Sequence, residues 1–109
     1  MSSEYCLVLC TCPDSQAADA IAAKLVDAGL AACVNIVPGL RSVYIWKGAR
    51  ETAQEHLLII KSRKAAYAGI ETAILSLHPY ELPEVISVPI EAGLPAYLQW
   101  IGESTRHGA

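Results

Sequence analysis

Apolar runs alternate with polar segments along the chain and predict four strands and three helices. Residues 5–12 are rich in strand-forming side chains and end at Pro13-Asp14, where Asp14 can cap the start of a helix. The helix that follows carries apolar residues at helical spacing and ends before Gly29. Residues 33–61 then predict a long hairpin, with a bulge or bend at Pro38-Gly39.

The second half of the chain predicts a helix, a strand and a terminal helix. The helix begins near Ser62 and ends by His78, because a residue before proline is driven out of helical geometry. Its buried face is expected to carry Tyr67, Ile70, Ile74 and Leu77. Residues 85–90 predict the fourth strand, and Pro95 suits the first turn of a short last helix. The order β-α-β-β-α-β plus a helix predicts a single α+β domain over residues 1–109, a ferredoxin-like sandwich with an extra C-terminal helix.

The predicted strands are apolar on both sides, whereas strands covered on one face alternate between apolar and polar residues. Residues 6–10 and 57–60 are apolar at both parities, and so are Val85, Ile86 and Val88. The two helices of such a fold cover only one face of its sheet. We therefore expect a homo-oligomer that covers the second face, with the last helix folding over it as the alternative.

Composition narrows the possible partners. Apolar residues make up 53% of the 109 residues and charged residues 17%, against about 25% in typical domains, so few charges cover the surface. A net charge of −3 argues against nucleic acid or an anionic membrane as a partner, and no apolar run is long enough to span a bilayer. Without a basic flank before the first strand, and with four cysteines that read as reduced thiols, we expect a cytoplasmic protein.

Polar side chains are concentrated in the segment between the second helix and the last strand. Pro79 and Pro83 fix φ at two places, so His78, Tyr80 and Glu81 sit in a stiff loop of the kind that a binding site needs. The alternative is a helix stop and an intersubunit contact, with His78 bonded to backbone.

Several short segments occur in a fixed order over residues 5–101. They are Thr11-Cys12-Pro13-Asp14, Leu30-Ala31-Ala32-Cys33-Val34-Asn35-Ile36 with Pro38-Gly39, Ser42-Val43-Tyr44-Ile45-Trp46-Lys47-Gly48, Glu55 with Lys61, His78-Pro79-Tyr80-Glu81 with Pro83-Glu84, and Tyr97-Leu98 with Trp100-Ile101. This ordered set resembles the divalent-cation tolerance family known as CutA. The resemblance implies a stable homotrimer of ferredoxin-like subunits, tolerance of divalent metals and especially copper, and no established enzymatic activity.

The resemblance also implies copper ligands, namely a cysteine in the first strand and two histidines at the end of a helix. These positions fall on Cys10 and His78, while Leu77 stands where the first histidine would be. Thiolate and imidazole are donors that copper prefers, but two of them do not close a tetrahedral centre. Copper or another divalent metal would then need ligands across a trimer interface, or the cysteines simply pack as small apolar residues.

A second possible function is a trimeric small-molecule-binding or signalling protein, like the nitrogen-regulatory trimers. Its candidate residues form a cleft between subunits that accepts an anion or carboxylate: Lys61, Trp46, Tyr80 and Glu81. The alternative is that the aromatic rings pack the trimer contact. An enzyme is not expected, because Cys10 and His78 form the only conceivable nucleophile–base pair and no residue orients the base. Of the other histidines, we expect His56 to face solvent on a hairpin strand and His107 to lie in the C-terminal tail.

Overall fold

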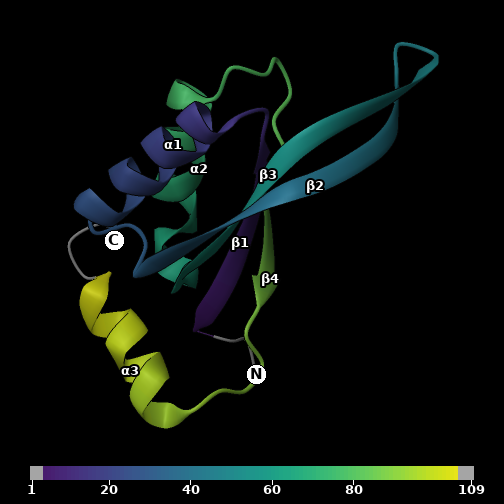
Figure 1. Cartoon of the computed structure of the whole chain (residues 1–109). Coiled ribbons are helices and arrows are strands. Elements are labelled where there is room, and N and C mark those ends of the chain that lie inside the picture. The colour runs from purple at the N-terminus through teal and green to yellow at the C-terminus, as the bar shows by residue number, and fades with distance from the viewer. Residues whose placement is uncertain (1–3, 106–109) are drawn as a thin grey trace.

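The computed structural model describes residues 4–105, and it contains one four-stranded antiparallel sheet with three α-helices (Figure 1). The elements are β1 Tyr5–Cys12, α1 Ser15–Asp27, β2 Cys33–Trp46, β3 Ala49–Arg63, the 3-10 turn η1 Lys64–Ala66, α2 Tyr67–Leu77, β4 Ile86–Pro89 and α3 Pro95–Ser104. The sheet order is β2-β3-β1-β4, with antiparallel pairing at every step. The predicted α+β class and element order are confirmed, while His107 lies outside the described residues.

The predicted ends of α1 are found at the positions that the sequence indicates. The Asp14 side chain accepts a hydrogen bond of 2.8 Å from the backbone N–H of Ala17, which caps the first turn. Gly29 follows the helix with a φ of +71°, a conformation that glycine adopts without strain. None of the helices described is both long and apolar enough to cross a membrane.

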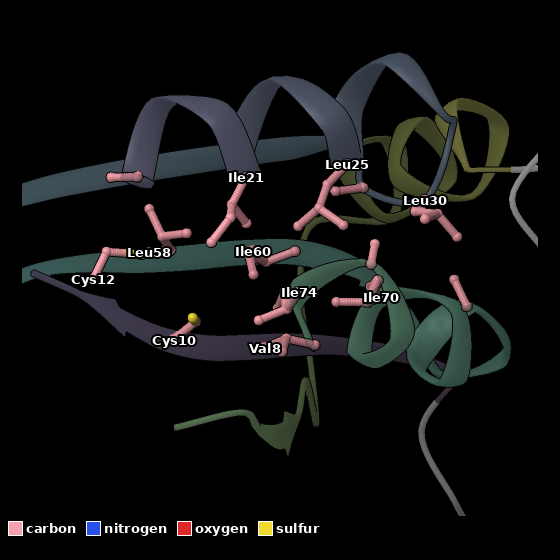
Figure 2. Close-up of a cluster of buried hydrophobic side chains, with 14 of the residues drawn as sticks. Val8, Cys10, Cys12, Ile21, Leu25, Leu30, Leu58, Ile60, Ile70 and Ile74 are labelled. Atoms are coloured by element: carbon pink, nitrogen blue, oxygen red, sulfur yellow. The ribbon is translucent and has the colours of Figure 1, made fainter. Parts of the chain in front are cut away.

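The hydrophobic core lies between one face of the sheet and the two helices α1 and α2 (Figure 2). Even-numbered residues of β1 and β3 point into it, while α1 and α2 contribute isoleucine and leucine side chains. The labelled core residues are Val8, Cys10, Cys12, Ile21, Leu25, Leu30, Leu58, Ile60, Ile70 and Ile74. The Ser62 hydroxyl, which is buried at the end of β3, donates to the Leu30 carbonyl at 2.6 Å and so has a partner.

The opposite face of the sheet is apolar, as the strand parity predicts. Leu9 pairs with Ile59 on one side and with Ile86 on the other, so these side chains share the face away from α1 and α2. Ile86 and Val88 are 50% and 41% exposed. The last helix does not cover the whole face: α3 lies at one end of it, where Arg63 of β3 bonds to Thr105, just past the helix.

Two boundaries and the burial of one side chain differ from those predicted. The second helix begins at Tyr67 rather than near Ser62, because β3 continues through Arg63, which pairs with Tyr5 of β1. Leu77, expected on the buried face of this helix, is 43% exposed in its last turn. The fourth strand is shorter than predicted and covers Ile86–Pro89.

The hairpin of β2 and β3 extends well beyond the helices as a two-stranded arm (Figure 1). The register between the two strands shifts between Val37 and Leu40, which confirms the predicted bulge at Pro38-Gly39. Gly39 has a φ of +79°, and nothing lies within 4 Å of where its side chain would begin. The bulge is therefore built on a conformation that favours glycine, with the arm beyond it.

Candidate metal site and the adjoining cavity

Two cysteines and one histidine meet at the end of the core. The Sγ atoms of Cys10 and Cys12 and a ring nitrogen of His78 all lie within 4.8 Å of one another. Cys10 and Cys12 are two residues apart on β1, so the pleat turns both toward the helices. His78 ends α2 with extended backbone, at ψ 135°, as the following Pro79 requires. The strand β1 and the C-terminal end of α2 thus bring three donor atoms close together.

Cys10 and Cys12 are both fully buried, and their side chains bond to each other. A hydrogen bond between them, together with burial, raises the pKa of the Cys10 thiol well above its usual value, and the same bond lowers the pKa of Cys12. The carboxylates of Glu84 and Glu55 raise the pKa of Cys10 further. Cys10 therefore holds its proton at neutral pH, and a metal ion would have to displace it.

Both ring nitrogens of His78 have backbone partners. Nδ1 accepts a hydrogen bond of 3.1 Å from the N–H of Tyr80, so the neutral ring carries its proton on Nε2. Nε2 in turn lies 2.7 Å from the Thr11 carbonyl oxygen and donates to it. One of these two bonds must be exchanged before the imidazole can ligate a metal.

A second histidine lies beside this group. His56 pairs with Cys12 across the ladder, so both side chains leave the sheet on the same face. Its Nδ1 is buried and has no hydrogen-bond partner among the residues the structure describes. The expectation that His56 faces solvent is therefore wrong. The period of two along β3, which places Leu58 and Ile60 in the core, also places His56 inward.

These donors fit a soft or borderline metal ion. Thiolate sulfur and imidazole nitrogen suit copper and zinc, whereas oxygen ligands suit magnesium and calcium. A buried imidazole nitrogen without a partner is unusual, and a nearby ion would give it one. Sequence reasoning placed Cys10 and His78 in the site. It missed Cys12, although the shared strand parity of the two cysteines carries that signal.

A cavity of about 650 Å³ lies on the other side of β1, on the face away from α1 and α2. Thr11 adjoins both the cavity and the candidate metal site. It lines the cavity, and its carbonyl oxygen accepts the hydrogen bond from His78. The remaining walls come from the arm and from the loop after α2. They are Ser42, Val43, Tyr44, Trp46, Glu55, Pro79, Tyr80, Glu81, Leu82 and Glu84.

Glu55 and Tyr80 form the most buried polar contact of the cavity. The Tyr80 hydroxyl donates to Oε2 of Glu55 at 2.8 Å, and Glu55 is only 6% exposed. Burial and this bond raise the pKa of Tyr80, because its phenolate would face the Glu55 carboxylate. The hydroxyl therefore stays a donor throughout the neutral range.

The structure brings together three of the four residues predicted for a ligand cleft. Trp46, Tyr80 and Glu81 line the same cavity, whereas Lys61 lies elsewhere. The Lys61 ammonium is 5.8 Å from the centroid of the Tyr97 ring of α3. Lys61 pairs with Leu7 and Cys33 in the sheet, several residues beyond the point at which Glu55 reaches the cavity.

Known proteins resemble this chain over nearly its full length. The chain matches the family model described as CutA1 divalent ion tolerance protein over residues 6–104. It is 44% identical over 99 residues to the divalent-cation tolerance protein CutA of Thermus thermophilus, covering 91% of this chain and 96% of that protein. It is 48% identical over 93 residues to the CutA homolog of Xenopus laevis, covering 85% of this chain but 62% of the frog protein.

Solved structures agree with these matches. The divalent cation tolerance protein from Thermus thermophilus superposes with a TM-score of 0.91 at 44% identity, covering 93% of this chain and 98% of that one. The structure of the periplasmic divalent cation tolerance protein CutA from Archaeoglobus fulgidus gives 0.91 at 35% identity, covering 94% and 99%. By sequence and by fold, the chain belongs to the CutA1 divalent ion tolerance family.

Proposed function

We propose that this protein acts in divalent-cation tolerance by binding copper at Cys10, Cys12 and His78, and that it binds the metal rather than catalysing a reaction. The observation that carries the proposal is the approach of three donor atoms to within 4.8 Å of one another. Family membership supports a role in metal tolerance.

The donor set favours copper in its cuprous state. Two thiolates and an imidazole form a soft ligand set, and a bound ion would replace the thiol protons of Cys10 and Cys12. His56 is the residue best placed to add a fourth donor, because it pairs with Cys12 and its buried Nδ1 has no partner among residues 4–105. His56 lies outside the group of three donor atoms that converge, so its ring would have to turn toward Cys12 to complete the site within one chain.

The same proposal includes a homotrimer of ferredoxin-like subunits. The antiparallel order β2-β3-β1-β4 supports that topology, and the apolar face around Leu9, Ile86 and Val88 supports association. A cytoplasmic location fits the free state of Cys6, Cys10, Cys12 and Cys33, because thiols persist in a reducing compartment.

Competition with a cuprous chelator tests the metal site. We expect one copper ion per chain, and an affinity that falls by about tenfold or more in Cys10→Ala and in Cys12→Ala. His78→Ala should lose less, because the parent chain must give up a backbone hydrogen bond to use that ring. Cys33→Ala is the matched control, because Cys33 lies on β2 outside the group. Unchanged binding in both β1 variants, or an equal loss in Cys33→Ala, would overturn the assignment.

A further inference from the structure

We propose that the cavity beside Glu55 binds a small organic cation carrying an alkylammonium or guanidinium group, with Glu55 as its charged partner. This site opens on the other face of β1 from the metal site. It lies at Thr11, beyond the segment Cys6–Leu9 that pairs with β4 and carries the apolar surface for which we propose association. The proposal rests on three features of the cavity: a buried carboxylate, a set of aromatic rings and the charge of its walls.

The carboxylate of Glu55 has one free oxygen. Oε2 accepts from Tyr80, whereas no donor and no cation within residues 4–105 contacts Oε1. Glu55 as a whole is only 6% exposed, but Oε1 is not among the buried atoms without a partner, so this oxygen keeps access to solvent. A cationic group in the cavity would pair with this oxygen at a carboxylate that the protein holds largely out of bulk water.

Aromatic rings line the same space. Tyr44 and Trp46 of the arm and Tyr80 of the loop are walls of the cavity. The faces of such rings attract ammonium and guanidinium groups and also pack against alkyl chains. Trp46 already shows this behaviour, since the Lys47 ammonium lies 5.7 Å from its ring centroid. A carboxylate among aromatic rings is the arrangement that selects an organic cation.

The charge of the walls that this chain supplies argues against an anionic ligand, which was the second possibility considered from the sequence. Three lining residues are glutamates, namely Glu55, Glu81 and Glu84, and none of the lining residues is lysine or arginine. A metal ion is also a poor occupant. Within the described part of the chain, the one group of three candidate ligands that converges is Cys10, Cys12 and His78, so the carboxylates do not converge on one ion. A larger cation would bridge groups that stand further apart.

The indole N–H signals in an NMR titration test this proposal directly. The chain has two tryptophans, Trp46 in the cavity and Trp100 on α3, so Trp100 is an internal control. The probe is n-butylammonium, with n-butanol and butyrate as the neutral and anionic molecules of matched shape. We expect saturable movement of the Trp46 signal with butylammonium alone, while the Trp100 signal stays in place. Equal responses to butyrate or butanol, no response to butylammonium, or a saturable response to magnesium at lower concentration would overturn the proposal.

Two variants identify the charged partner. Glu55→Gln keeps the shape of the side chain and removes its charge, so the affinity for butylammonium should fall by about tenfold or more. Glu103→Gln removes an exposed carboxylate from α3 and should leave the affinity unchanged. Cys12→Ala, which disables the proposed metal site, should still bind butylammonium, so failure of one proposal is distinguishable from failure of the other. Unchanged binding in a folded Glu55→Gln protein contradicts the assignment.

Discussion

The imidazole of His78 donates to the carbonyl oxygen of Thr11 at 2.7 Å, and so joins the end of α2 to the strand that carries both cysteines of the metal site. Thr11 lies between Cys10 and Cys12 in sequence, so the bond fixes the ring beside the two sulfur atoms. The helix end and the strand are thus held in place by backbone contacts before any metal arrives. Preorganisation of this kind lowers the cost of binding.

Copper affinity should rise with pH. The pKa of Cys10 is raised in the metal-free protein, so binding must release the proton that its thiol holds near neutrality. Each proton released makes the affinity rise by about tenfold per pH unit below the thiol pKa. Chelator competition at pH 6, 7 and 8 measures this slope. A flat profile would show that the thiol of Cys10 does not ligate.

Val88→Lys should break the proposed trimer. Val88 lies on the apolar sheet face and is 41% exposed, so a lysine there would bring a charge into the interface. Leu75→Lys is the control, because Leu75 is 57% exposed on α2, on the helical side of the sheet. Light scattering should give three subunits for the parent chain and for Leu75→Lys, and fewer for Val88→Lys. A monomeric parent chain at micromolar concentration contradicts the expectation.

Tyr80→Phe should lower the free energy of unfolding by about 1–2 kcal/mol at pH 7.5, because the hydroxyl bonds to a buried carboxylate. The folded-state pKa of Tyr80 is raised above its unfolded value of about 10. The stability from this hydroxyl is therefore complete below pH 10 and is lost as the pH rises above it. Urea denaturation at pH 7.5 and 10.5 should show the difference between parent and variant shrinking.

The Tyr80→Phe and Glu55→Gln effects should also be coupled. Because the two side chains bond to each other, the double variant should lose less stability than the two single variants combined. Additive losses would mean that the 2.8 Å contact contributes nothing to stability in solution.

Arg63→Lys should loosen the last helix. The Nε and Nη2 atoms of Arg63 donate to the hydroxyl and the carbonyl oxygen of Thr105 at 2.8 and 2.7 Å. A lysine cannot reproduce this forked pair, so we expect a loss of about 1–2 kcal/mol and faster hydrogen exchange in α3. Lys64→Gln, an exposed neighbour, is the control. Equal exchange of α3 amides in parent and Arg63→Lys would contradict the expectation.

Local chemistry made much of the fold predictable. Asp14, Gly29 and Pro79 each impose a backbone conformation that does not depend on distant residues, so the ends of α1 and of α2 follow from sequence. The start of α2 did not, because a long-range pair between Tyr5 and Arg63 extends β3 beyond the point where the helical pattern begins. Such a pair is set by the register of two strands that are distant in sequence.

The candidate site was predicted only in part, for a related reason. Cys10 and His78 came from a resemblance. Strand parity groups Cys12 with Cys10 and His56 with Leu58, but only the strand pairing places Cys12 opposite His56. Lys61 was grouped with Trp46 by charge and ring chemistry, but the long strand β3 places Lys61 and Glu55 far apart along the sheet. Without Lys61 the cavity has no positive charge in its walls, so the ligand that we propose is a cation rather than an anion.

The register shift at Pro38-Gly39 divides the β2–β3 ladder into two parts, and the strand register of one part does not determine the register of the other. Val34–Val37 pairs with the segment of β3 that carries the core residues Leu58 and Ile60, while Leu40–Trp46 pairs with Ala49–Glu55 to form the arm. A one-residue slip normally turns every side chain of a strand to the wrong face. Here the bulge can absorb a slip in the arm before it reaches the core. A slip in the arm would therefore leave the packing of the core unchanged and would displace only the cavity walls that the arm supplies.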